Sequence, residues 1–242
     1  MITVIFENPP LEILLPQYEK ESIMEFIIDH HLFKGLSEET LNFLYSRARP
    51  LKIKRGVVLT KEGEKNRGFY LLRHGVVKVV RYRTNSKEVI LWLAGTGDCP
   101  GIDSLFCSDL YKTTSVAVKE SFAYFITKRA FDELVQKNPS VSVEMMKYIS
   151  GKIDDLETRI YNMNKKRRSS SFADILSTLD SRRGSKNLIP DLLSIDEIAS
   201  LLGSDKRYVY ALINQLAEKN IVSFDDGILE ILNAKALKDM AA

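Results

Sequence analysis

The side chains best suited to contact a nucleic acid lie in one short stretch near the C-terminus. Lys206 and Arg207 are adjacent cations, Ser204 precedes them, and the phenols Tyr208 and Tyr210 follow. Ammonium and guanidinium groups donate to phosphates and to guanine, and a tyrosine can touch a phosphate or a thymine methyl group. We therefore take these five residues as candidate DNA contacts. Either tyrosine could instead pack against a neighbouring helix.

The pattern around these residues predicts a helix-turn-helix. Ser194 and Glu197 have the spacing of a capping box, and Gly203 would end the first helix in a left-handed turn. Ser204 or Asp205 would cap the second helix. The inner stripe of that helix would consist of Val209, Leu212, Ile213 and Leu216. An ordinary helical hairpin inside a core is the alternative.

Two β-type runs, 221–224 and 228–232, flank Asp225-Asp226-Gly227. An Asp-Gly pair between apolar runs predicts a hairpin, and a hairpin directly after a helix-turn-helix makes a winged helix. Because the two aspartates would repel a phosphate backbone, we expect the wing to be mainly structural.

Composition bounds the class of protein. The chain has 242 residues, 45% of them apolar, and a net charge of +3, so it can bury a sizeable core and is expected to hold two domains. From residue 165 to the end there are twelve Lys and Arg against eleven Asp and Glu. Any positive surface for DNA must therefore come from the clustering of cations on one face rather than from total charge. The candidate clusters are 165–168, 182–186 and 206–207.

Other functional classes have little support. Cys99 and Cys107 make neither a disulfide framework nor a four-ligand metal site. No apolar run approaches the roughly 20 residues needed to span a bilayer, and the N-terminus lacks the basic leader of a signal peptide. We expect a cytoplasmic protein without a membrane partner. No nucleophile–base pair or phosphate loop is visible, so we do not expect an enzyme.

The sequence pattern of the first half predicts a β-barrel or jelly roll. Two helical stretches, about 23–33 and 37–47, precede short β-rich runs separated by glycine turns. These runs are 57–59, 69–72, 76–80, 89–93, 114–118 and 122–126. The predicted fold class is α+β.

A long helix, about 138–164, is expected between the halves. Its apolar residues alternate at spacings of three and four, which is typical of pairing with an identical helix. They are Met146, Ile149, Ile153, Leu156, Ile160 and Met163. A homodimer is therefore expected, with packing of the helix on its own barrel as the alternative.

This order of parts resembles the cyclic-AMP receptor protein/fumarate-nitrate reductase regulator (CRP/FNR) superfamily. The resemblance covers about residues 21–232 and rests on the motifs at 62–64, 69–79, 86–91 and 97–106 together with the helix-turn-helix. The expected organisation is an N-terminal extension (1–20), a cyclic-nucleotide-binding-like effector barrel (21–137), a dimerisation helix (138–164) and a winged-helix DNA-binding domain (165–242).

The resemblance implies a ligand pocket, and there the sequence departs from the family. Cyclic-nucleotide binders place a glutamate after a glycine for the ribose and an arginine for the phosphate. Here Gly101 is followed by Ile102, and the arginine position is Lys112, followed by Thr113 and Thr114. Isoleucine accepts no hydrogen bond, and lysine lacks the bidentate fork that suits a phosphate. A cyclic nucleotide is therefore disfavoured.

Other effectors are weighed in the same way. An iron–sulfur cluster needs four cysteines and is not expected. A haem could use an axial His or Cys, and thiols could sense redox state, but a structural role is favoured for each candidate. The candidates are His30, His31, His74, Cys99 and Cys107. The effector stays unidentified, and the protein could act without one.

The implied function is a homodimeric, sequence-specific transcription regulator of bacterial type. Its partners would be double-stranded DNA, a second copy of the chain and RNA polymerase. An effector would change packing near Leu156 and Glu157, which the resemblance places beside the ligand, and reorient the winged helices. Many members carry an Arg-Glu pair early in the recognition helix and an arginine one turn later. Here those positions are Lys206-Arg207 and Ala211, so the common DNA half-site does not transfer.

Two alternatives remain open at this point. One is a cyclic-nucleotide-responsive module that acts mainly through protein partners, and the other is a haem-based gas or redox sensor.

Overall fold

The computed structural model describes residues 26–27, 30–33, 35–83, 88–165, 168–182, 193–225 and 228–241. Side chains at 159, 162–165 and 181–182 lie outside this description, as do the predicted N-terminal extension and residues 23–25 and 28–29 of the helix expected at 23–33. The chain forms two compact units, Met1–Val79 with Ala94–Gly151, and Val80–Leu93 with Lys152–Ala242. Within the described ranges, no helix combines the length and apolar character needed to cross a bilayer.

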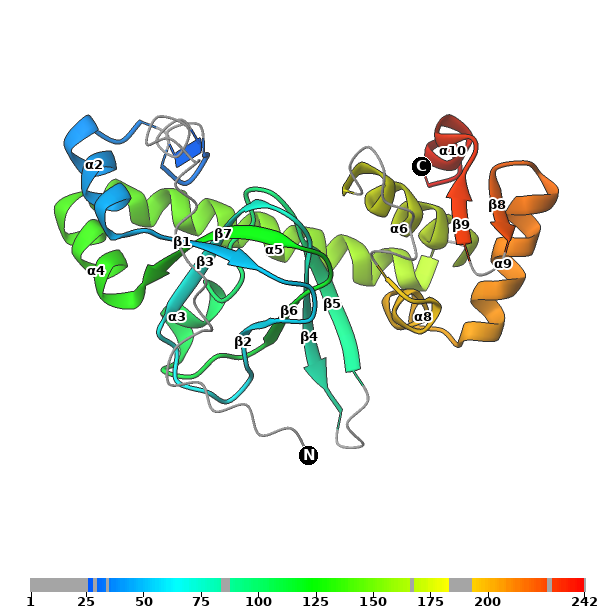
Figure 1. Ribbon diagram of the computed structural model, residues 1–242, viewed down its shortest axis with the longest axis horizontal. Coiled ribbons are helices and arrows are strands. Elements are labelled where there is room, and N and C mark those ends of the chain that lie inside the picture. The colour runs from blue at the N-terminus through cyan, green and yellow to red at the C-terminus, as the bar shows by residue number, and fades with distance from the viewer. Residues whose placement is uncertain are drawn as a thin grey trace. The chain divides into compact units, whose positions relative to one another are not determined.

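Ahead of the winged-helix elements, antiparallel strands form two sheets, as the short β-rich runs separated by glycine turns predicted (Figure 1). One sheet has the order β1 (Arg49–Ile53), β7 (Ser121–Thr127), β3 (Gly68–His74). The other has the order β2 (Val58–Thr60), β6 (Thr114–Ala117), β4 (Val77–Tyr82), β5 (Glu88–Ala94). The α+β class, with a β-barrel of the jelly-roll type ahead of a helical C-terminal part, is confirmed.

The β1-β7-β3 sheet has two faces of different character because successive side chains of a strand alternate. Phe122, Tyr124 and Ile126 of β7 join a buried apolar cluster that includes residues of the flanking helices. Phe125 and Thr127 therefore lie on the opposite face of the strand. The first face supplies the core of the unit, and the second is free to line a cavity.

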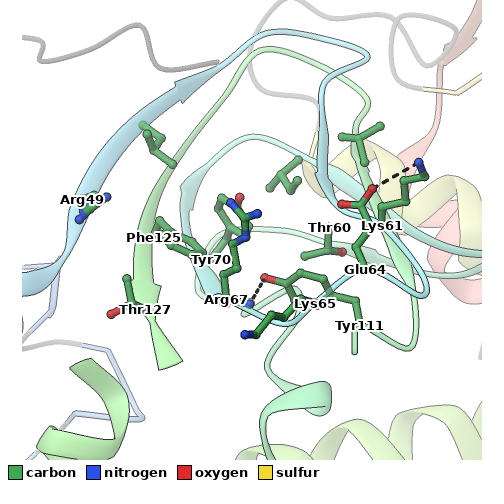
Figure 2. A pocket seen from close by; sticks show the side chains of 13 residues that line it. Arg49, Thr60, Lys61, Glu64, Lys65, Arg67, Tyr70, Tyr111, Phe125 and Thr127 are labelled. Atoms are coloured by element: carbon green, nitrogen blue, oxygen red, sulfur yellow. Dashed lines mark hydrogen bonds and ion pairs between the residues drawn. The ribbon is translucent and has the colours of Figure 1, made fainter. Parts of the chain in front are cut away.

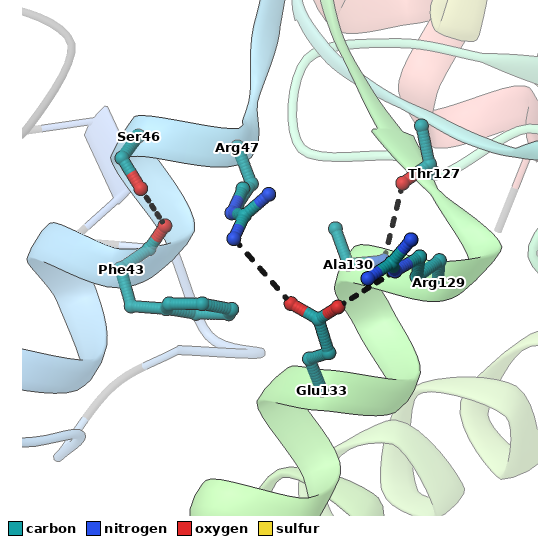
Figure 3. Close-up of polar contacts among 7 residues, drawn as sticks. All are labelled: Phe43, Ser46, Arg47, Thr127, Arg129, Ala130 and Glu133. Carbon is teal, nitrogen blue, oxygen red and sulfur yellow. Dashed lines mark hydrogen bonds and ion pairs between the residues drawn. The ribbon is translucent and has the colours of Figure 1, made fainter.

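Helices cover the first face. They are α2 (Glu38–Arg47), α3 (Asp103–Cys107) and α4 (Lys128–Lys137), and Thr127 caps α4 by accepting from the N–H of Ala130 at 3.1 Å. Glu133 of α4 pairs with Arg129 at 2.9 Å and reaches Arg47 of α2 at 3.7 Å (Figure 3). The exposed pairs add little energy, and the apolar cluster below them holds α2 and α4 together.

The long helix is α5 (Ser140–Lys165), which begins two residues later and ends one residue later than predicted. Its first half buries Val141, Met145 and Tyr148 in the same apolar cluster. These residues recur at spacings of four and three, so they form one face of the helix.

The second unit contains the winged-helix elements. They are α6 (Arg168–Arg182), α8 (Ile195–Leu202), α9 (Lys206–Glu218), β8 (Val222–Asp225), β9 (Ile228–Ile231) and α10 (Ala234–Ala241). Helices α6 and α10 pack through fully buried Phe172, Leu176, Leu179 and Leu237. The sequence patterns did not single out α3, α4, α6, α10 or β1.

Candidate nucleic-acid interface

Local hydrogen bonds define the start and end of α8. The Oγ of Ser194 accepts from the N–H of Glu197, and the carboxylate of Glu197 accepts from the N–H of Ser194 at 2.8 Å. This reciprocal pair is the predicted capping box. Gly203 ends the helix with φ of 63°, where a residue with a Cβ would be strained. Ser194 and Glu197 therefore fix the start of α8, and Gly203 fixes the turn that leads to α9.

Asp205, one of the two predicted alternatives, caps α9. Its Oδ1 accepts from the N–H of Tyr208 at 3.0 Å, and this bond, together with the nearby Arg207, lowers the pKa of the carboxyl group. The cap therefore remains ionised at neutral pH. Ser204 precedes the cap and is half-buried.

The inner face of α9 is fully used by the core of the module. Val209, Leu212, Ile213 and Leu216 are all at most 5% exposed, as predicted. From α8 the core receives Ile198, Ala199, Leu201 and Leu202, and from the wing region Ile221, Val222, Leu229 and Ile231. Because these contacts fix the rotation of α9 about its axis, the opposite face of the helix must point to solvent.

That opposite face begins with the two predicted cations. Lys206 and Arg207 are both exposed, and among the described residues each has one long ion pair, Nζ to Asp196 at 3.9 Å and Nε to Asp205 at 3.8 Å. Exposed pairs of this length hold a side chain weakly. Both cations can therefore leave their carboxylates for a phosphate or a base edge.

The two tyrosines are partly packed and partly free. Tyr208 lies beneath the guanidinium of Arg168 from α6, 5.4 Å from the ring centroid. Tyr210 meets Phe224 of the wing edge-on at 5.9 Å. Their exposed fractions are nevertheless 36% and 41%. Both rings lie at the edge of the exposed face, and their contact with DNA remains a prediction.

Sequence reasoning did not assign Asn214 and Gln215, which continue the exposed face of α9 beyond Ala211. Asn214 lies seven residues after Arg207, two helical turns along the same face. A side-chain amide can donate to and accept from adenine, so these two residues extend the set of candidate base contacts. Their spacing from Arg207 was the signal that could have identified them.

The wing strands β8 and β9 pair from Val222 with Ile231 to Asp225 with Ile228. The hairpin prediction is therefore confirmed for the strands, while Asp226 and Gly227 lie outside the described residues. Asp225 and Glu230 are exposed, and the strand residues described here carry no cation. This distribution fits a wing that supports α9 rather than one that binds a phosphate.

Of the basic clusters considered, the structure describes Lys206-Arg207 in full and the side chain of Arg168. Residues 166–167 and 183–186 lie outside the described part of the chain, as do the side chains of Lys165 and Arg182. Their contribution to DNA binding remains a prediction.

The seam predicted on α5 is mostly exposed to solvent. The exposed fractions are 59% for Met146, 51% for Ile153, 39% for Leu156 and 61% for Ile160. Ile149 is partly covered by the apolar cluster, and the side chain of Met163 lies outside the described residues. The seam is thus separate from the face that the helix buries against its own unit.

The residues implied for the effector pocket have mixed environments. Ile102 is 4% exposed and belongs to the apolar cluster with the flanking helices. Lys112 is exposed, and its N–H donates to the Oγ of Ser104 at 3.0 Å. Gly101, with φ of +89°, would carry a Cβ 3.2 Å from the Tyr111 ring.

The two threonines of this set are buried and hydrogen-bonded to neighbouring segments. Thr114 Oγ1 accepts from the N–H of Glu62 at 3.0 Å, and the Thr113 carbonyl accepts from Thr60 at 3.2 Å. Leu156 and Glu157 are exposed on α5. The pocket as a whole remains a prediction, and Ile102 is the member whose packing fits it least.

Two of the haem and thiol candidates, His30 and Cys99, are buried in the fold. His30 is 5% exposed, its Nε2 donates to the Gly97 carbonyl at 2.8 Å, and its Nδ1 accepts from the N–H of Leu32. Burial lowers the pKa of His30 to about 4, so the imidazole is neutral. Cys99 is buried, as predicted, and Cys107 is exposed. In the ranges that the structure describes, no cluster of three or more His, Cys, Asp or Glu could hold a metal.

Comparisons with known proteins support the same architecture. Residues 50–138 match the cyclic nucleotide-binding domain family. The Cyclic AMP receptor protein of Thermus thermophilus is 24% identical over 212 residues, which cover 87% of this chain and 96% of that protein. The Fumarate and nitrate reduction regulatory protein of Vibrio cholerae is 24% identical over 207 residues, or 84% of this chain and 82% of that protein.

A solved structure extends the similarity to three dimensions. A transcriptional regulator of the CRP/FNR family from Thermus thermophilus superposes with a TM-score of 0.67 at 18% identity, covering 80% of this chain and 98% of that chain. The similarity therefore spans the β unit and the winged-helix elements together. It shows that the two chains share a fold, and the two curated relatives agree with the resemblance that the sequence motifs indicated.

Proposed function

We propose that this chain, which has the fold of the CRP/FNR transcription regulators, binds specific sites on double-stranded DNA as a homodimer. The observation that carries the proposal is the division of α9 into two faces. Its inner face is buried in the winged-helix core, and its outer face presents Lys206, Arg207 and Asn214 to solvent. A helix divided in this way can enter a major groove without disturbing its own fold.

The electrostatics of α9 agree with this role. The C-terminal part of the sequence has a near balance of charges overall, but the first turn of α9 concentrates two cations that have only weak partners. Arginine offers a planar fork to guanine, and an asparagine amide two turns later offers the pattern that suits adenine. Specific contacts are therefore expected from a small set of side chains rather than from a broad basic surface.

The proposed homodimer rests on α5. Four seam residues remain between 39% and 61% exposed on a helix whose other apolar face is already buried. An apolar seam with alternating spacings of three and four is buried when two such helices pair. A dimer would hold two recognition helices about 34–36 Å apart, to match successive major grooves.

The experiment that tests DNA recognition is a selection of genomic fragments by the purified full-length chain without added ligand. Recovery of a two-fold symmetric site would support a dimer that is competent alone. If only background is retained, the selection is repeated with cyclic AMP and with a small-molecule library. Failure under every condition would contradict the proposed function.

Arg207→Ala then tests the recognition helix on the selected site. We expect specific affinity to fall roughly 5- to 150-fold, because one bidentate base contact contributes about 1–3 kcal/mol. Lys219→Ala is the matched control, since Lys219 is an exposed cation at the C-cap of the same helix. Equal affinities of the two variants in a fluorescence-anisotropy titration would exclude α9 as the reading element.

A further inference from the structure

A second site of ligand chemistry lies in the first unit, outside the pocket implied by the family. A cavity of about 210 Å³ opens beside the β1-β7-β3 sheet, on the face that carries Phe125 and Thr127 (Figure 2). Strand β2 and the turn after it form the other wall. None of the seven residues assigned to the implied effector pocket lines this cavity.

The rim of the cavity is strongly cationic. Arg49, Lys61, Lys65 and Arg67 all line it, and Glu64 is the only carboxylate among the lining residues. Lys61 pairs with Glu64 at 3.3 Å, whereas Arg49, Lys65 and Arg67 have no carboxylate partner in the described ranges. Three cations at one opening, without a carboxylate partner in the described part of the chain, would attract and hold an anion.

The floor of the cavity is apolar with one polar group. The rings of Tyr70 and Phe125 meet with centroids 4.9 Å apart. Tyr70 is 5% exposed, yet in the part of the chain that the structure describes its hydroxyl has no hydrogen-bond partner. Burial raises the pKa of this phenol, so it keeps its proton and remains a donor. A phenol that lines a cavity and has no hydrogen-bond partner among the described residues fits a site that is completed by a ligand.

The second phenol at the site has a positioning role. The hydroxyl of Tyr111 donates to the Gly68 carbonyl at 2.8 Å and accepts from the N–H of Arg67 at 3.3 Å. Tyr111 therefore fixes the backbone that carries Arg67 at the entrance. Figure 2 shows Arg67 and Tyr70 together near the centre of the cavity, with Arg49 to one side and Lys61 to the other.

The geometry points to a binding site for a small organic anion, a carboxylate or phosphate ester on a compact apolar or aromatic body. The anionic group would meet the guanidinium groups of Arg49 and Arg67, and the hydroxyl of Tyr70 would donate to it. The body would lie against Phe125 and Leu51. Guanidinium groups suit this role because their planar fork donates two hydrogen bonds to a carboxylate or a phosphate.

Calorimetric titration of the full-length protein with benzoate and with phenyl phosphate tests the proposal, with benzyl alcohol as the neutral probe. We expect at least one anion to bind and benzyl alcohol to bind far more weakly. Arg67→Gln and Arg49→Gln should each weaken anion binding roughly 10-fold or more, because each removes a charge-assisted hydrogen bond. Tyr70→Phe, which keeps the ring, should weaken it several-fold.

Two control variants locate the anion. Arg55→Gln makes the same chemical change at an exposed position outside the cavity and should leave binding unchanged. Lys112→Gln alters the implied effector pocket and should also have no effect. No binding of either anion, equal binding by the Arg67→Gln variant, or loss of binding only in Lys112→Gln would each overturn the proposal. No DNA is present, so the result is independent of the proposed DNA binding.

Discussion

Helix α5 carries two apolar stripes that have opposite fates within one chain. Val141, Met145 and Tyr148 are at most 8% exposed in the core of the first unit. Met146, Ile153 and Ile160 are between 51% and 61% exposed. Both stripes have helical spacing and similar residue types, so composition does not distinguish them.

The difference shows which apolar residues of α5 a single chain can bury. The buried stripe meets Phe33, Phe131 and Leu134 in the apolar cluster, and its burial contributes to the stability of the unit itself. Each side chain of the exposed stripe remains more than half exposed in the folded monomer. The pairing of two α5 helices proposed above would bury it, and changes on the two stripes should affect different measurements.

The largest expected effect comes from the exposed stripe. The double substitution Ile153→Glu and Ile160→Glu would place carboxylates in an apolar dimer seam, where desolvation costs several kcal/mol per ion. We expect the dimer Kd to rise on the order of 1000-fold or more and DNA affinity to fall with it. Sedimentation velocity measures the first effect, and anisotropy measures the second.

Thr158→Glu provides the control for that change. Thr158 is exposed and lies two residues before Ile160, so it faces away from the seam. It should leave association and thermal stability unchanged. If the seam variant still sediments as the wild-type protein does, α5 is not the dimer interface.

The second effect is a loss of folding stability at acid pH, caused by a histidine next to the buried stripe. His31 stacks on Tyr148 with ring centroids 5.3 Å apart, and His30 contacts His31 at 4.4 Å. Burial lowers the pKa of His30 from 6.5 to about 4, so between these values the unfolded chain binds more protons than the folded chain. The stabilisation is complete above about pH 6.5 and is lost as the pH falls towards 4, by roughly 3 kcal/mol in total.

Urea unfolding measured at pH 7 and pH 5 checks this expectation. The wild-type protein should lose about 2 kcal/mol more over that interval than His30→Gln, because the variant lacks the titrating group. His74→Gln, at an exposed histidine, should behave as the wild type does. Identical pH dependence of all three proteins would show that His30 is not the acid-sensitive group.

The smallest expected effect is a change in the free energy of unfolding when the hydroxyl of Tyr148 is removed from the buried stripe. The hydroxyl of Tyr148 accepts from the N–H of Cys99 at 2.9 Å. Tyr148→Phe would remove this buried hydrogen bond and should lower the free energy of unfolding by about 1–3 kcal/mol, with the dimer Kd unchanged. Tyr210→Phe, at a 41% exposed ring, should change stability by less than about 0.5 kcal/mol.

Local signals predicted the helix-turn-helix well because its determinants are close in sequence. The capping box at Ser194 and Glu197, the left-handed Gly203 and the cap at Asp205 each act within a few residues. The period of Val209, Ile213 and Leu216 then gave the rotation of α9. The candidate DNA contacts followed from that rotation, although Asn214 and Gln215 were not identified.

Other elements were not predictable from local patterns. Strand β1 contains Pro50 and two cations, and it becomes a strand by pairing with β7 from Arg49 opposite Phe125 to Ile53 opposite Ser121. Its partner is distant in the chain, so no local window contains the information. The packing of Ile102 among the helices could not be predicted either, because its contact partners are also distant in the chain.

Periodicity and capping are local properties, and they were enough to predict the helix-turn-helix, the two faces of α9 and the apolar seam on α5. The folded chain was needed to show which stripe of α5 is buried, which residues share a cavity, and which cations have no carboxylate partner among the described residues. Arg49, Arg67, Tyr70 and Phe125 meet at one opening because antiparallel pairing joins β1, β3 and β7. Such contacts depend on distant segments, whose pairing is a property of the whole fold.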